Sequence, residues 1–307
     1  QFVKEGKIQN TALKQIWRAP QFPPSLHLLL YGILEKFEVI FRLDKEGREN
    51  KQNEDVFFSG QSLVPSLLPE AQPAGYEGFT AFNSPTLKPG EIQYGRQYRF
   101  NFLPHGIFSR LTIRLHCMMD VEAAWKRGLV LAPSVSSKIL VTLSLPSAKK
   151  KYTVLSVLVR GKGSERAFRL VLECIDTLVE GWYEVEPIIT IPCLLCMATS
   201  NCAQEHYHSL EECEKAVIAE KKTINCLYSG GSMPLELLVP DILMVSVGEK
   251  QIDFESLQVE NKIGEGGFAD VFRGVWKNET VAIKKVTLGL LIRTPLPTKS
   301  LLITNVF

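Results

Sequence analysis

Between residues 263 and 284, the residue types and their spacing suit the binding of nucleotide phosphates. The stretch reads IGEGGFADVFRGVWKNETVAIK, with Gly264, Gly266 and Gly267 close together. Glycines permit backbone conformations that side chains forbid and let backbone N–H groups approach phosphate oxygens closely. The apolar run that follows ends on Lys284, whose ammonium would stand where an α/β-phosphate pair needs a positive charge. We therefore predict a glycine-rich turn between two strands, then a third strand that ends on Lys284.

This combination resembles the start of a protein kinase domain, in which a glycine-rich loop covers ATP and a lysine follows on the third strand. Ala269 stands where that family often has its third glycine. Lys285 is the runner-up for the phosphate lysine, but strand alternation puts it on the opposite face from Lys284. The alternative is a glycine-rich hairpin that binds nothing. The residues predicted to bind ATP are Ile263, Gly264, Glu265, Gly266, Gly267, Phe268, Ala269, Val271, Ala282 and Lys284.

The 22 residues after Lys285 contain neither Asp nor Glu. A kinase needs a glutamate partner for its lysine, a catalytic base and acidic ligands for Mg²⁺ beyond this point. We therefore expect no catalytic residue in this chain, which would be inactive by itself, and Mg²⁺ would be held by residues not present. The tail 287–307 is interrupted by prolines and does not fit the expected helix. Because the chain also starts at Gln1 rather than at a methionine, we expect it to be a fragment of a longer protein.

A second chemical feature is a group of cysteines and histidines. Cys193 and Cys196 form a CxxC pair, and the residues that follow are Cys202, His206, His208, Cys213 and Cys226. Thiolates at such spacing can bind Zn²⁺ tetrahedrally, so the predicted metal ligands are Cys193, Cys196, Cys213 and Cys226. The alternative is a set of buried, reduced cysteines. A redox function is disfavoured, because no thioredoxin-like βα turn surrounds the CxxC pair.

Composition sets broad limits. A chain of 307 residues is long enough for two domains, and 45% hydrophobic and 22% charged residues are typical of globular proteins. The net charge of +2 gives no argument for binding nucleic acid or an anionic membrane. No apolar run is long enough to span a bilayer. Seven clustered cysteines favour a reducing compartment, and we expect the cytoplasm.

The elements that would position these sites give an α+β pattern. Residues 7–41 predict two helices, the second with a stripe of Leu26, Leu30, Ile33, Phe37 and Phe41 and with His27 on the surface. Strands and turns dominate residues 56–160, including a buried strand over residues 62–69. A helix after Pro104 would expose Arg110 and Arg114 to solvent.

The later elements are a helix after Gly163, with Phe168, Leu172, Ile175, Val179 and Trp182 in one stripe, and strands over residues 185–191 and 235–240.

Residues 10–245 as a whole resemble the COR region of Roco proteins, the segment between a Ras-like Roc GTPase and a kinase. The resemblance covers about four fifths of the chain. The motifs that carry it, in the family's order, are Ile16–Trp17, Leu34–Glu38, Leu63–Pro69, Phe102–Leu111, Trp125–Gly128, Pro192–Cys196, Leu210–Cys213 and Leu238–Leu243.

The resemblance implies a domain organisation. Residues 1–45 would be the helical end of COR-A, and residues 56–247 a mixed α+β COR-B domain with a cysteine-rich segment at 193–226. Residues 257–286 would begin the antiparallel β lobe of a serine/threonine kinase similar to the leucine-rich-repeat kinases.

It also implies a function for the parent protein. COR-B would dimerise it and couple the upstream Roc GTPase, which binds GTP outside this chain, to the kinase. The alternative is a non-catalytic COR scaffold or dimerisation module, with or without bound zinc.

Overall fold

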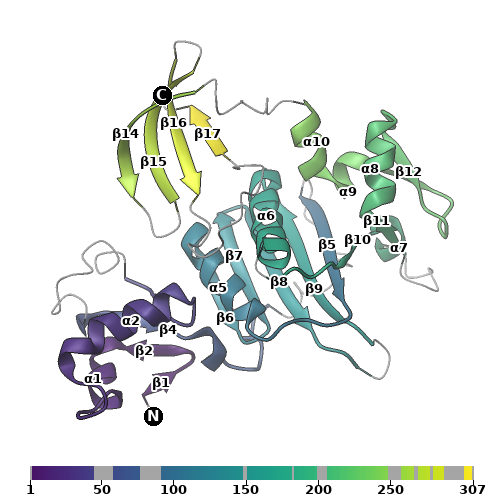
Figure 1. Cartoon of the computed structure of the whole chain (residues 1–307). Coiled ribbons are helices and arrows are strands. Elements are labelled where there is room, and N and C mark those ends of the chain that lie inside the picture. The colour runs from purple at the N-terminus through teal and green to yellow at the C-terminus, as the bar shows by residue number, and fades with distance from the viewer. Residues whose placement is uncertain are drawn as a thin grey trace. The chain divides into compact units, whose positions relative to one another are not determined.

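A computed structural model of the chain describes residues 2–44, 58–76, 91–147, 151–181, 183–198, 206–247, 257–265, 269–276, 279–286 and 301–305. The chain divides into two compact units, residues 1–247 and residues 248–307. Both contain antiparallel sheets, and helices accompany the sheets of the first unit (Figure 1), which confirms the α+β class.

A seven-stranded antiparallel sheet with the order β11-β10-β5-β9-β8-β7-β6 is the centre of the first unit. Its strands are β5 (Ile92–Phe100), β6 (Val121–Trp125), β7 (Gly128–Ser134), β8 (Ser137–Ser144), β9 (Thr153–Gly161), β10 (Ile188–Pro192) and β11 (Tyr207–Ser209). Strands β7, β8 and β9 are rich in Val, Leu and Ile, the residues that suit a sheet buried on both faces. Gly161 ends β9 with a positive φ of 136°, at a place where a Cβ would collide with the backbone of Ser136.

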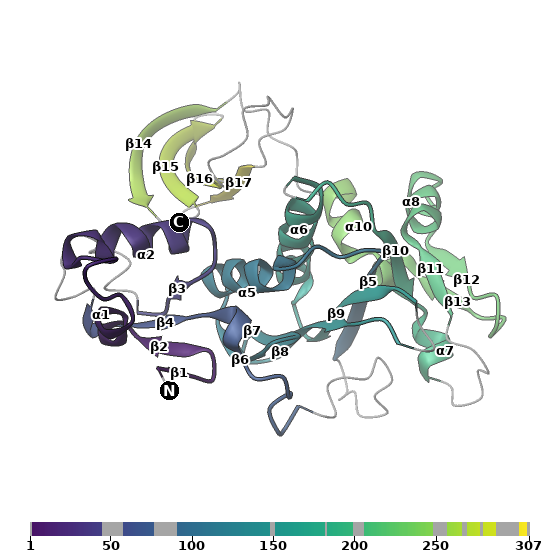
Figure 2. The same ribbon diagram turned by 60° about the horizontal axis from the view of Figure 1, so that its bottom comes forward.

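Two helices, α5 (Ile107–Met118) and α6 (Glu165–Gly181), cover one face of this sheet, as Figure 2 shows. The predicted stripe of α6 is confirmed, because Phe168, Leu172, Ile175 and Val179 are all buried in the main core. Trp182 lies outside the described residues. A smaller cluster around Trp125, Val130, Leu140 and Leu158 covers part of the other face.

The segment before the central sheet, which we call the first subdomain, contains two helices, as predicted, together with a small sheet that was not predicted. Its four-stranded sheet has the order β1-β2-β4-β3. Its elements are β1 (Val3–Lys4), β2 (Lys7–Gln9), η1 (Asn10–Ala12), α1 (Leu13–Ile16), η2 (Pro24–Leu26), α2 (His27–Lys36), β3 (Phe41–Arg42), β4 (Gln61–Leu63) and η3 (Pro65–Leu67). The predicted strand over residues 62–69 ends at Leu63, because a proline cannot donate to a sheet ladder and Pro65 begins a 3₁₀ turn.

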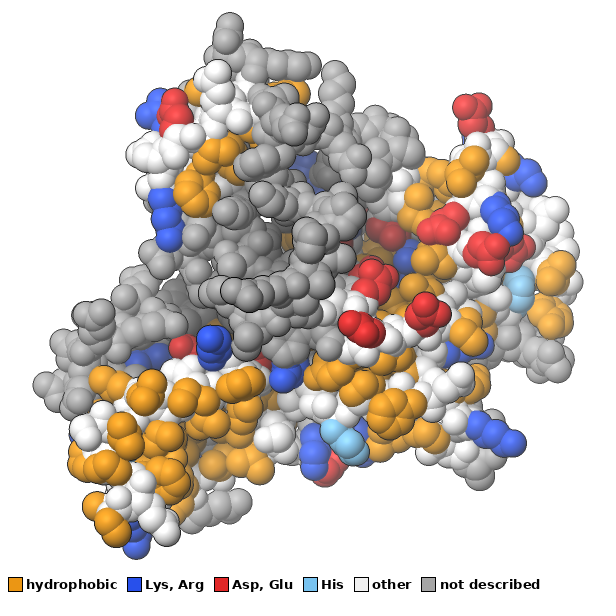
Figure 3. All heavy atoms as spheres, in the orientation of Figure 1, with side chains coloured by type: hydrophobic (Ala, Val, Ile, Leu, Met, Phe, Trp, Pro, Cys, Tyr) orange, Lys and Arg blue, Asp and Glu red, His pale blue; other side chains and the backbone are white. Residues whose placement is uncertain are grey.

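Helix α2 turns the opposite way from the prediction. His27 and Tyr31 are buried, at 3% and 4% exposure, while Leu26, Ile33 and Phe37 are 40%, 43% and 47% exposed. Figure 3 shows hydrophobic side chains gathered over this segment. The surface position predicted for His27 is therefore wrong, since its ring packs against Trp17 at a centroid distance of 5.4 Å.

After β10 the chain builds a lobe of short elements, which we call the cysteine lobe (residues 188–198 and 206–247). These elements are α7 (Leu194–Ala198), α8 (Leu210–Ile218), β12 (Thr223–Asn225), β13 (Ser232–Pro234), α9 (Leu235–Leu238) and α10 (Pro240–Val247). Residues 235–240 are helical rather than the predicted strand, because a short buried apolar run has no periodicity that separates the two.

The second unit is a four-stranded antiparallel sheet with the order β14-β15-β16-β17. The strands are β14 (Gln258–Glu265), β15 (Ala269–Trp276), β16 (Glu279–Val286) and β17 (Leu301–Asn305). The first three are the strands predicted around the glycine-rich turn, and β17 was not predicted. In the described part of the chain, no helix has the length and hydrophobicity needed to cross a bilayer.

Candidate functional site

The strand arrangement expected around the glycine-rich turn is present in the second unit. Strands β14 and β15 are antiparallel neighbours, and Gly264 pairs with Val271 close to the turn that joins them. Strand β16 lies on the other side of β15, where Lys284 pairs with the same Val271 and Lys285 pairs with Asp270. The backbone register thus brings Gly264 on β14 and Lys284 on β16 to the two sides of the same residue, Val271.

The predicted ATP-binding residues are distributed over these three strands. Those on described backbone are Ile263, Gly264 and Glu265 on β14, Ala269 and Val271 on β15, and Ala282 and Lys284 on β16. The residues of the turn itself, Gly266, Gly267 and Phe268, lie outside the described residues.

Four potential metal ligands meet in the cysteine lobe. The ligand atoms of Cys193, Cys196, His206 and Cys226 all lie within 4.8 Å of one another, and all four side chains are buried. Three of these residues were predicted from the sequence. His206 takes the place predicted for Cys213, and we call the four residues the Cys₃His cluster.

Hairpin ends bring the cluster together. Cys193 directly follows β10 and His206 directly precedes β11, and the Cys193 N–H donates to the His206 carbonyl at 2.9 Å. Cys226 directly follows β12, and its N–H donates to the Gly231 carbonyl at 2.8 Å, which closes the turn to β13. Cys196 lies on α7, which starts after Cys193. Each ligand is therefore held by backbone structure at the edge of a strand or helix.

The contacts inside the cluster are close but not covalent. The Sγ atoms of Cys196 and Cys226 are 3.1 Å apart, and Cys226 Sγ lies 3.4 Å from His206 Nδ1. The backbone N–H of Ser229 donates to Cys226 Sγ at 3.4 Å. Although burial opposes ionisation, hydrogen bonds from Ser229 and Cys196 lower the pKa of the Cys226 thiol to about 5. The site therefore favours a thiolate at this position.

Cys213 and His208 lie beside the cluster but are not among its four residues. Cys213 on α8 is fully buried in the apolar core of the lobe, and burial raises the pKa of its thiol to about 12, so it behaves as a small apolar side chain. His208 is also fully buried, and among the described residues neither of its ring nitrogens has a hydrogen-bond partner. Its ring contacts that of His206 at a centroid distance of 4.4 Å.

No local pattern in the sequence separates His206 from Cys213 as the fourth residue of the cluster. In the structure, His206 stands directly before β11, the strand that pairs with β10. Cys213 lies within α8, one helical turn beyond the N-cap Ser209, and therefore faces the core rather than the hairpin ends. Cys202 lies outside the described residues.

A buried ion pair joins the first subdomain to the central sheet. Arg114 on α5 donates from Nε to Glu38 Oε1 at 2.8 Å and from Nη2 to Oε2 at 3.3 Å, and both side chains are only 6% exposed. Arg110 Nη1 lies 3.8 Å from the same carboxylate. The solvated face predicted for these two arginines is therefore wrong, because the helix buries that face against the first subdomain.

A second buried ion pair fixes the start of α10. Arg96 on β5 donates from Nη2 to Asp241 Oδ1 at 2.8 Å, with the two side chains 3% and 14% exposed. Asp241 lies in the first turn of α10, where a negative charge is favourable. Asp176 on α6 belongs to the same region: burial raises the pKa of its carboxyl to about 6, although hydrogen bonding from Tyr98 and the charge of Arg96 act in the opposite direction.

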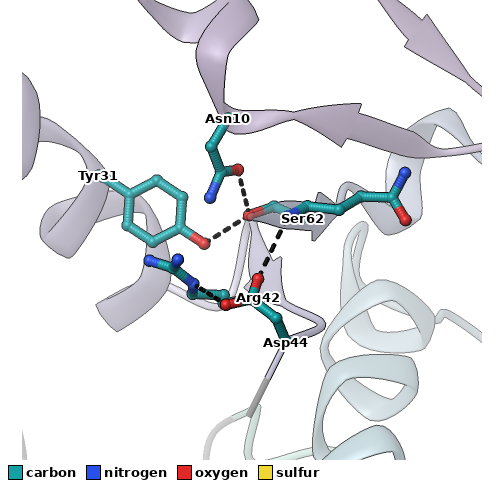
Figure 4. A network of polar contacts seen from close by, with 6 residues as sticks. Asn10, Tyr31, Arg42, Asp44 and Ser62 are labelled. Atoms are coloured by element: carbon teal, nitrogen blue, oxygen red, sulfur yellow. Dashed lines mark hydrogen bonds and ion pairs between the residues drawn. The ribbon is translucent and has the colours of Figure 1, made fainter. Parts of the chain in front are cut away.

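A third polar cluster, drawn in Figure 4, lies inside the first subdomain. Ser62 Oγ donates to Asn10 Oδ1 at 2.7 Å and lies 2.7 Å from the Tyr31 hydroxyl. Beside it, Arg42 Nε donates to Asp44 Oδ2 at 2.8 Å. These groups satisfy one another, so the network stabilises the packing of α2 on the small sheet and offers no free ligand atoms from Asn10, Ser62 or Tyr31.

Comparison with known proteins gives one family match and several relatives. Residues 91–241 match the family described as the C-terminal of Roc, COR-B domain. The chain is 35% identical over 288 residues to the "Probable serine/threonine-protein kinase pats1" of Dictyostelium discoideum, covering 93% of this chain and 8% of that relative.

Two further relatives come from the same organism. "Cyclic GMP-binding protein C" is 29% identical over 299 residues, covering 92% of this chain and 11% of the relative. "Probable serine/threonine-protein kinase roco9" is 26% identical over 254 residues, covering 76% of this chain and 7% of the relative. The chain thus spans about a tenth of the length of the curated relatives it matches.

Proposed function

The chain belongs to the Roco family, and we propose that it is the part of a Roco-type serine/threonine protein kinase where a COR-B domain leads into an ATP-binding kinase lobe. The observation that carries the proposal is the antiparallel run β14-β15-β16, in which Gly264 and Lys284 both pair with Val271. Two of the relatives are named as serine/threonine-protein kinases.

Burial within the second unit supports a nucleotide-binding face. Val281 and Ile283 are buried with Leu257 in a small apolar cluster. Because successive positions of a strand alternate between faces, positions 282 and 284 belong to the other face, together with position 271, which pairs with 284. In the proposed complex, positions 271 and 282 lie over the adenine base and Lys284 binds the α/β-phosphates. Mg²⁺ is held by residues of the parent protein outside this chain.

The test is phosphoryl transfer by the full-length parent protein. Lys284→Met should lower kcat/KM for ATP by about 100-fold or more, the usual cost of removing one charged donor from a transition state. Lys285→Met is the matched control and should retain nearly all activity, because its position lies on the other face. If Lys285→Met is inactive and Lys284→Met is active, our assignment of the phosphate lysine is wrong.

We further propose that COR-B holds two copies of the parent together and couples an upstream Roc GTPase in the same polypeptide to the kinase. The Arg96–Asp241 ion pair supports coupling, because it fixes to β5 the helix that leads out of this domain. Dimerisation is tested by sedimentation of the purified chain over a range of concentrations. A mass of twice the chain is expected, and a single chain at every concentration would exclude self-association by this region.

A second candidate function is a non-catalytic COR scaffold. The observation that favours it is the extent of the COR-B match, residues 91–241, which makes up about half of the chain. It predicts that the full-length protein dimerises but transfers no phosphoryl group with or without Lys284. In either case we propose that the protein is located in the cytoplasm, because the six cysteines of the described part of the chain are free thiols. We propose no nucleic-acid partner.

A further inference from the structure

The Cys₃His cluster has the donor set and burial of a closed zinc site. Structural Zn²⁺ sites take four Cys or His ligands in a tetrahedron, and Cys₃His is one of the usual combinations. We propose that Cys193, Cys196, His206 and Cys226 bind one Zn²⁺, which holds the ends of the β10–β11 and β12–β13 hairpins together. The proposal concerns the folding of the cysteine lobe and does not depend on the kinase function proposed above.

The distances suit a shared ion better than any bond between the side chains. A disulfide requires about 2.05 Å between sulfurs, whereas Cys196 Sγ and Cys226 Sγ are 3.1 Å apart. Zinc bonds of about 2.3 Å to sulfur and about 2.0 Å to nitrogen place tetrahedral ligands about 3.5–3.8 Å from one another. All four ligand atoms here lie within 4.8 Å of one another. Only a small adjustment of side chains is needed to reach that geometry.

The backbone around the ligands is already arranged for metal binding. The Cys193–His206 backbone hydrogen bond of 2.9 Å extends the β10–β11 ladder, so the two ligands emerge side by side. The Ser229 N–H points at Cys226 Sγ, and such a hydrogen bond orients a thiolate and stabilises its charge. Burial opposes ionisation of the thiols. Zn²⁺ binding displaces their protons, and the charge of the ion offsets the cost of burying the thiolates.

The chemistry of the ligands also selects the class of metal. Thiolate and imidazole ligands favour zinc over magnesium and calcium, which prefer oxygen. Because the protein supplies all four ligands, no coordination position remains for a substrate, and the role is structural rather than catalytic. The ion would stabilise the lobe that ends in α10, because Leu238 and Val239 pack in the same apolar core as the three cysteines.

The experiment is a metal analysis of the full chain, expressed in zinc-supplemented medium and purified under reducing conditions. Wild type should contain close to one zinc per chain, and Cys226→Ser and His206→Ala should contain less than about a tenth of that. Cys213→Ser and His208→Ala are the matched controls, since both are buried beside the cluster, and both should retain the metal. His206→Cys should also retain it, because a fourth thiolate replaces the imidazole.

Cobalt substitution separates loss of a ligand from loss of folding. Wild-type chain stripped with a chelator and titrated with Co²⁺ should show the intense visible absorption of a tetrahedral site, saturating at one equivalent, and His206→Cys should add thiolate charge-transfer absorption. Wild-type protein with neither zinc nor a tetrahedral cobalt spectrum would overturn the proposal. Loss of metal in Cys213→Ser with retention in His206→Ala would overturn the assignment of the ligands.

Discussion

The first unit contains two buried polar clusters whose polar atoms are satisfied in different ways. In the network of Asn10, Tyr31 and Ser62, oxygens meet at 2.7 Å and satisfy one another. In the Cys₃His cluster, the Cys196–Cys226 and Cys226–His206 contacts are 3.1 and 3.4 Å and involve sulfur, a weak hydrogen-bonding atom. Buried polar groups require partners. The comparison teaches that the first cluster is complete by itself, whereas the second converges on a point that a cation would occupy.

Removing the metal should destabilise the protein more than any of the substitutions described below. The binding free energy of structural zinc in small sites is about 10 kcal/mol or more, and it becomes folding free energy. A chelator should therefore remove amide-exchange protection from residues 206–239 while the region around Ser62 stays protected. The measurement is hydrogen exchange followed by mass spectrometry. Equal loss of protection in both regions would contradict the independence of the two clusters.

Breaking the ion pair between the first subdomain and α5 should have the next largest effect. Glu38→Ala leaves Arg114 buried without its carboxylate, and such losses cost about 3–5 kcal/mol. Denaturant unfolding of the full chain should record that decrease in the free energy of unfolding. Glu38→Gln keeps the shape and one acceptor and should cost less. An unchanged midpoint for Glu38→Ala would mean that the two parts do not stabilise each other through this contact.

Removing the central hydroxyl of the polar network should have a smaller effect. Ser62→Ala takes a partner from both Asn10 and Tyr31, and each unsatisfied buried group costs about 1–3 kcal/mol. The expected result is a lower free energy of unfolding with unchanged zinc content. Ser232→Ala, at an exposed position on β13 of the cysteine lobe, is a control and should change stability little. A larger loss in Ser232→Ala would reverse the comparison.

The smallest effect concerns pH. Burial raises the pKa of Asp176 from 3.8 to about 6, so the folded state binds this proton more tightly than the unfolded state does. The contribution of Asp176 to stability is therefore complete below about pH 4 and is lost as pH rises through about 6. Asp176→Asn should remove this slope, making the variant more stable than wild type at pH 7 by about 3 kcal/mol. If the free energy of unfolding of wild type and of Asp176→Asn changed with pH in parallel, Asp176 would not be the source of this pH dependence.

Local patterns were enough to predict some parts of this molecule. The stripe of α6 and the three strands around the glycine-rich turn follow from spacing within each segment, and they are confirmed. The orientation of α2 was not predictable in the same way. Its apolar stripe is exposed and His27 is buried, because Trp17 and the small sheet supply a site that accepts an imidazole and a tyrosine.

The amino-acid sequence by itself determined three features: the CxxC pair, the glycine-rich segment followed by a strand that ends on Lys284, and the family resemblance. Each of these depends on short motifs whose residues are close together in the chain. Only the tertiary structure decided that His206 rather than Cys213 joins the cysteines, and that Glu38 meets Arg114, 76 residues away. The physical reason is that ligands and ion pairs are selected by which strand and helix ends meet in space. That choice is made by sheet pairing and core packing over the whole domain.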